Sequence, residues 1–157
     1  MNPDIAKRAE LLDEQYAEMS ARRIKAAAKL AEEFKKMYEA AEPIMQVMRK
    51  HSMYYRHPDL DPRYKTTHGP IVGRNDGLSE LYYFDGHFVN CINARDGKPA
   101  EPDPLHVELF CQICDEEFAL RGLQWIFTCS DEIISGEKRK AERLEEYAQD
   151  IKRSREG

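Results

Sequence analysis

The chain of 157 residues carries 24 lysines and arginines against 29 aspartates and glutamates, a formal net charge of −5. This acidic balance disfavours a general nucleic-acid-binding protein, which usually has an excess of basic residues. No apolar run approaches the roughly 20 residues that span a bilayer, and no signal peptide is expected. We therefore expect a cytoplasmic protein without a membrane partner, in which the four cysteines stay reduced.

Residues 4–41 have the spacing of one long amphipathic helix. Apolar residues recur every three or four positions, and the range contains neither glycine nor proline. Asn2 is the expected N-cap, and Pro3 is the expected first helical residue. At about 1.5 Å per residue the helix would span roughly 57 Å, which exceeds the diameter of a globular domain of this size.

This length indicates that part of the helix projects, and we expect that part to form a coiled coil with a second copy. Arg23 interrupts the apolar stripe, whose large members are Ile5, Leu12, Tyr16, Met19, Leu30, Phe34 and Met37. The alternative is that the helix packs on the chain's own domain. The first interpretation predicts a homodimer, and its orientation stays open.

Pro43 predicts an end or a kink of this helix near Glu42, within a helical segment of residues 1–51. Residues 52–77 contain three prolines and three glycines, which predicts a long exposed loop at the start of a small α+β domain of residues 52–157. Residues 78–84 and 87–93 are rich in aromatic and β-branched side chains. They flank Asp85-Gly86, which predicts a β-hairpin with a two-residue turn.

Asp103-Pro104 predicts the start of another helix, and Gly122 predicts its end. The apolar spacing after residue 106 favours the helix, although residues 107–113 also alternate as a strand would. Residues 123–129 predict a third strand beside the hairpin. A last charged helix is expected from Ser130 or Ser135. The predicted fold is therefore α+β, with a long N-terminal helix, a small antiparallel sheet of about three strands and two further helices.

The cysteines raise the possibility of a structural zinc ion. Cys111 and Cys114 form a C-x2-C pair, and Cys91 and Cys129 could complete the four thiolates that tetrahedral zinc prefers. A second C-x2-C pair is missing, and Ile113 lies within an apolar run instead of a tight polar turn. Burial as small hydrophobic residues is the favoured interpretation, so no cofactor is expected.

The predicted loop reverses the charge of the chain locally, because its basic residues outnumber its acidic ones. Basic groups interleaved with tyrosines can bind phosphates or stack on bases. The candidate ligand-binding residues are Arg56, His57, Arg63, Tyr64, Lys65, His68 and Arg74. The alternative is that the tyrosines pin the loop to the core while the basic groups are solvated.

His57, Asp59, Asp61 and His68 could also hold a divalent metal, although ordinary turns explain the Pro-Asp and Asp-Pro pairs equally well. The sequence contains no nucleophile elbow, P-loop or dinucleotide-binding motif. The leading hypothesis is a non-enzymatic protein–protein interaction module of the adaptor or inhibitor type, with a protein partner of unknown identity. The alternatives are a zinc-stabilised nucleic-acid-binding module and a small metal-dependent hydrolase.

Overall fold

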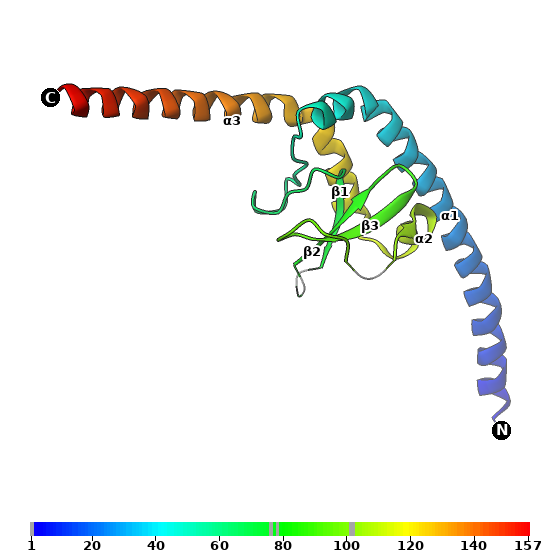
Figure 1. Cartoon of the computed structure of the whole chain (residues 1–157). Coiled ribbons are helices and arrows are strands. Elements are labelled where there is room, and N and C mark those ends of the chain that lie inside the picture. The colour runs from blue at the N-terminus through cyan, green and yellow to red at the C-terminus, as the bar shows by residue number, and fades with distance from the viewer. Residues whose placement is uncertain (1, 76, 78, 101–102) are drawn as a thin grey trace.

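The computed structural model describes residues 2–75, 77, 79–100 and 103–157, which form an α+β fold (Figure 1). The helices are α1 (Pro3–Lys50), α2 (Val107–Ile113) and α3 (Glu116–Glu156). The strands form one antiparallel sheet in chain order, composed of β1 (Ile71–Asn75), β2 (Glu80–Phe84), β3 (Phe88–Asn93) and β4 (Leu105–His106). The predicted α+β class and the long N-terminal helix are confirmed, with four strands in the described residues where about three were expected.

Helix α1 begins as the sequence predicts, because the Asn2 side chain accepts a hydrogen bond of 2.9 Å from the main-chain N–H of Asp4. The helix does not end at Pro43 but continues to Lys50. Figure 1 shows its axis bending in the cyan turns near this end. Met45 and Met48 are fully buried beyond the proline, so their packing offsets the hydrogen bond that Pro43 cannot donate.

The predicted hairpin is confirmed, because β2 pairs with β3 from Phe84 opposite Val89 to the far end of both strands. Its turn lies one residue later than expected. The main-chain N–H of Asp85 donates to the Phe88 carbonyl over 3.0 Å, so Gly86 and His87 are the central residues. Gly86 has a φ of +102°, a conformation that glycine adopts without steric cost.

The prediction of a helix over residues 107–113 is confirmed, whereas the prediction of a strand over residues 123–129 is wrong. Helix α3 begins immediately after α2 and runs through the whole of this range. Asp115 caps it by accepting a hydrogen bond of 3.1 Å from the Phe118 N–H, and Glu116 and Glu117 favour its positive end. The additional strands come from residues 71–75, inside the predicted exposed loop, and from the short β4.

Gly122 does not end a helix but lets α3 approach β1 closely. A Cβ atom at this position would lie 1.7 Å from the Ile71 carbonyl oxygen and 3.0 Å from the His57 ring. Leu123 and Ile126, on the same side of α3, are almost fully buried. The apolar run that resembles a strand is therefore the inner face of a helix.

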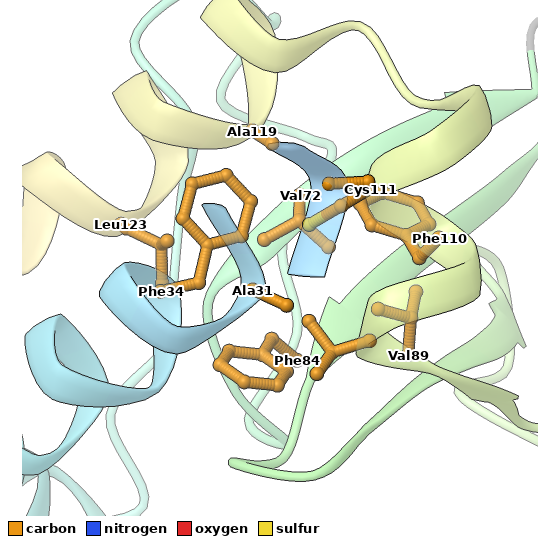
Figure 2. Packing of buried hydrophobic residues seen from close by; sticks show 11 residues of the cluster. Ala31, Phe34, Val72, Phe84, Val89, Phe110, Cys111, Ala119 and Leu123 are labelled. Atoms are coloured by element: carbon orange, nitrogen blue, oxygen red, sulfur yellow. The ribbon is translucent and has the colours of Figure 1, made fainter. Parts of the chain in front are cut away.

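Two of the core clusters join the helices to the sheet and to each other. In the first, Phe34 of α1 packs with Val72 and Phe84 of the sheet and with Leu123 of α3 (Figure 2). The second lies between the C-terminal turns of α1 and the middle of α3, and consists of Ala41, Met45, Met48, Tyr55, Trp125, Ile126 and Cys129. Buried residues of α1 begin at Ala27, so the core lies along its C-terminal half.

The remaining parts of the two long helices project from this body. We call residues 3–26 of α1 the N-terminal arm and residues 137–156 of α3 the C-terminal arm, and nearly all of their residues are exposed. At about 1.5 Å per residue they extend roughly 36 Å and 30 Å. Figure 1 shows the arms leaving the body in different directions, with the chain termini at their far ends.

Replacing Gly122 with alanine should destabilise the fold, because the added Cβ would overlap the main chain of β1. We expect Gly122→Ala to lower the free energy of unfolding by an amount at the upper end of about 1–3 kcal/mol. Gly136→Ala is the matched control, since no atom lies within 4 Å of its added Cβ. There the change should raise stability by about 0.5–1 kcal/mol. Urea unfolding measures both, and equal effects would contradict this account.

Candidate functional site

The predicted self-association stripe divides into an exposed and a buried part. Ile5, Leu12, Tyr16 and Met19 are 60%, 67%, 68% and 52% exposed on the N-terminal arm. The other three members, Leu30, Phe34 and Met37, pack on the chain's own domain. Phe34 is fully buried in the core, and Leu30 and Met37 are partly buried against the same cluster.

The C-terminal arm carries a second row of exposed apolar side chains. Leu144, Tyr147 and Ile151 are 57%, 61% and 68% exposed, and their spacing places them on neighbouring positions of one helical surface. Ile134, just before this arm, is also exposed. Both arms therefore present apolar surface that the body of the protein does not cover.

His57 is a structural residue that ties the 52–70 segment to α3. Its ring is buried and stacks on Phe118, with 3.7 Å between the ring centroids. The main-chain N–H of Asp59 donates to Nδ1 over 3.0 Å, and Nε2 lies 2.7 Å from the Phe118 carbonyl oxygen, to which it donates in the neutral ring. Burial lowers the pKa of His57, which keeps the ring uncharged.

This arrangement removes His57 from the predicted ligand and metal sites. Asp59 makes a two-pronged ion pair with Arg121, with distances of 2.7–3.0 Å. Asp61 lies 3.8 Å from Arg63, and His68 Nδ1 lies 2.9 Å from the Thr66 hydroxyl. The described residues contain no group of three or more histidines, cysteines or acids that could hold a metal ion. The metal site suggested by the sequence is therefore not assembled.

The four cysteines are free thiols, and within the described residues they do not gather into a group of three or more possible metal ligands, so the tetrathiolate zinc alternative has no assembled site. Cys91 on β3 donates to Glu80 over 3.5 Å, and burial and this carboxylate raise the pKa of the thiol to about 11. Cys129 lies in the second core cluster, where burial raises the pKa of its thiol. Cys111 lies in the last turns of α2, and Cys114 is its C-cap.

Of this pair, Cys114 has the thiol with the lower pKa. The Cys111 thiol donates a hydrogen bond that favours the Cys114 thiolate and lowers its pKa, against the opposing effects of burial and of Glu116. The N-terminus of α3, which starts two residues later, also favours a negative charge. The same hydrogen bond raises the pKa of Cys111. Cys114 is half-buried and lines a hollow of about 470 Å³.

Three of the basic residues predicted to bind a ligand lie over tyrosine rings. The Lys65 ammonium lies 4.3 Å from the Tyr54 ring centroid, and the guanidinium groups of Arg63 and Arg74 lie 5.4 Å and 4.8 Å from that of Tyr64. Cation–π contacts of this kind position a positive charge without neutralising it. Arg56 lies elsewhere, 3.7 Å from Glu132 of α3.

Three of the predicted ligand-binding residues, Arg63, Lys65 and His68, do line one common hollow of about 460 Å³. Its opposite wall is the turn after β3, which contributes Arg95, Asp96 and Gly97. The sequence gives no sign that this turn faces the 63–68 segment. Arg95 was therefore missed as a candidate, because only the folded sheet brings the two segments together.

Among the described residues, no helix has a stretch apolar and long enough to cross a membrane. Comparison with models of protein families, with curated proteins and with solved structures found no match. Any account of function therefore depends on the chain's own surfaces.

The lowered pKa of His57 predicts a loss of stability in mild acid. In the unfolded chain the imidazole titrates near its ordinary pKa of about 6.5. Between that value and the lower folded pKa, the unfolded state binds more protons, so the free energy of unfolding decreases as the pH falls. Urea unfolding at several pH values, followed by Trp125 fluorescence, measures this slope. His57→Gln should flatten it, whereas the exposed control His51→Gln should leave it unchanged.

Cys114 should react with iodoacetamide before the other three cysteines at neutral pH, because the thiolate is the nucleophile. Peptide mass spectrometry after timed labelling identifies the order. Cys111→Ala removes the donor to Cys114 and should slow its labelling several-fold, whereas Cys129→Ala should have little effect on that rate. Preferential labelling of Cys91 or Cys129 would contradict this assignment.

Proposed function

We propose that the chain is a non-enzymatic protein–protein interaction module of the adaptor or inhibitor type, which forms a homodimer through its N-terminal arm. The observation that carries this proposal is the exposed stripe of Ile5, Leu12, Tyr16 and Met19 on a helix that projects from the body. Large apolar side chains gathered on one uncovered surface mark protein contacts. A second copy of the same arm offers the self-complementary surface that a two-fold dimer needs.

The stability of the arm also supports a partner. Most helical stability in proteins comes from packing of an apolar face, and the large apolar side chains of the N-terminal arm are not packed on the body. Full burial of Ile5, Leu12 and Met19 from two copies contributes roughly 9–18 kcal/mol. Association costs about 4–15 kcal/mol in lost freedom of motion. The balance favours a dimer of moderate affinity that dissociates on dilution.

Charges beside the stripe favour parallel pairing. In a coiled coil, Ile5, Leu12 and Met19 would occupy one of the two apolar core positions of the heptad. Arg8 and Asp13 then flank this core on opposite sides, five residues apart. This is the spacing at which opposite charges meet across a parallel two-stranded coiled coil. Arg8 would face Asp13 of the partner subunit, and the contact would occur twice by symmetry. Arg23 would lie near its own copy at the end of the seam, where solvent can screen the repulsion.

The C-terminal arm would then be free to bind a different protein, which we propose to be cytoplasmic like this chain. Its row of Leu144, Tyr147 and Ile151 is exposed and leaves the body in another direction (Figure 1). An amphipathic helix binds other proteins by laying such a row into an apolar groove. The 52–77 segment is less suited to this role, because Tyr55, His57 and Ile71 of that segment are buried.

The dimer is tested with Leu12→Asp combined with Tyr16→Asp, both on the exposed part of the stripe. Two buried carboxylates from each copy should abolish pairing, because burial of unpaired charges is strongly unfavourable. Sedimentation equilibrium over a concentration series should show a dimer for the unchanged chain and a monomer for the variant. Near-ultraviolet circular dichroism of Trp125 should stay unchanged, since neither residue contacts the core.

The matched control is Leu144→Asp combined with Ile151→Asp, which makes the same change on the C-terminal arm. It should leave the dimer intact. A monomeric unchanged chain, or a dimer that persists in Leu12→Asp/Tyr16→Asp, would contradict the proposal. Dissociation by the control alone would assign self-association to the C-terminal arm instead.

A further inference from the structure

We propose that the hollow between the 63–68 segment and the turn after β3 binds a dianionic phosphate group, carried by a small phosphate monoester or by free phosphate. This inference is independent of self-association, since neither arm lines the hollow. It has a volume of about 460 Å³, and its charged lining residues are Arg63, Lys65, Arg95 and Asp96. That volume lies within the range of about 300–1,000 Å³ typical of small-molecule sites.

The charge of this lining matches the proposed ligand. Arg63, Lys65 and Arg95 contribute three positive charges and Asp96 one negative charge, which leaves a formal charge of +2 in a chain of net charge −5. A phosphate monoester carries about −1.5 to −2 at neutral pH. A single carboxylate would neutralise about half of the charge in the hollow. The balance therefore favours phosphate over a monocarboxylate.

The positive groups remain able to bind an anion. Within the described residues, no carboxylate forms an ion pair with the Arg95 guanidinium. Lys65 rests on the Tyr54 ring, and Arg63 lies over Tyr64 and only loosely beside Asp61, at 3.8 Å. Arginine forms paired hydrogen bonds with phosphate oxygens, and lysine adds a point charge.

Both walls of the hollow are fixed by hydrogen bonds that involve the main chain, which reduces the entropy lost on binding. Tyr55 and Thr66 exchange main-chain hydrogen bonds of 2.7 Å and 3.2 Å beneath the 63–68 wall. In the opposite turn, the Asn93 side chain accepts from the Arg95 N–H, and the Asp96 side chain accepts from the Lys98 N–H, each over 2.9 Å. Asp96 is thereby engaged within its own turn.

The organic part of an ester has room beside the phosphate. A second hollow of about 330 Å³ shares Arg63, Ala94 and Arg95 with the first and adds Tyr64 and Ser79. The two arginines therefore stand between two adjoining spaces. A phosphate held between them could extend its organic group into either space.

Isothermal titration calorimetry on the full chain tests this proposal, with phenyl phosphate and inorganic phosphate as probes near pH 7.5, where the monoester is dianionic. We expect millimolar or tighter binding of phenyl phosphate, and weakening of about tenfold in Arg95→Gln and in Arg63→Gln. The matched control is Arg143→Gln, the same substitution on the C-terminal arm. It should leave the affinity unchanged.

The two probes also distinguish the two sources of the phosphate group. Tighter binding of phenyl phosphate identifies a monoester as the ligand, and equal affinities identify free phosphate. Phenyl sulfate, a monoanion of similar shape, should bind at least several-fold more weakly. Absence of binding by both phosphate probes would overturn the proposal. Equal weakening in Arg95→Gln and Arg143→Gln would overturn it as well, because it would show only general attraction between charges.

Discussion

The close approach of α3 to β1 at Gly122 is the contact on which the rest of this structure depends. It brings a helix main chain against the Ile71 carbonyl and places the His57 ring in the same space. Because α3 lies this close, Leu123 reaches the core cluster around Phe34, and Phe118 can stack on His57. One position without a side chain thus joins the helix, the sheet edge and the 52–70 segment.

The sequence predicted the elements whose signals are local. The periodic apolar residues of α1, the Asp-Gly dipeptide of the hairpin and the spacing after His106 each mark an element that the structure contains. Residues 123–129 misled because the buried inner face of α3, with Leu123, Trp125 and Ile126, is followed by the exposed Phe127, and together they form a short apolar run like that of a buried strand. Gly122 resembles a helix stop unless the neighbouring main chain of β1 is known, and that contact is tertiary.

The candidate binding surfaces also differ in whether local sequence signals were enough to predict them. The exposure of Ile5, Leu12, Tyr16 and Met19 follows from a helix longer than the domain, so sequence length and periodicity were sufficient to identify it. The position of the sheet against α1 decides which members of the stripe enter the core. Phe34 could not be assigned to the core without knowing that position. Likewise Arg63, Lys65 and His68 lie close together along the chain, whereas their meeting with Arg95 depends on how the sheet folds back.

Because α3 is held close to β1 at Gly122, its orientation is set near its N-terminal end. The N-terminal part of α3 packs against Ile71 and the core, and its C-terminal part carries the exposed Leu144 and Ile151. From residue 122 to residue 156 the helix path covers about 50 Å. A tilt of α3 by a few degrees near Gly122 would displace its C-terminal end by several ångström. Small changes in packing at the sheet edge would therefore set where the C-terminal surface meets another protein, without any change in the residues of that surface.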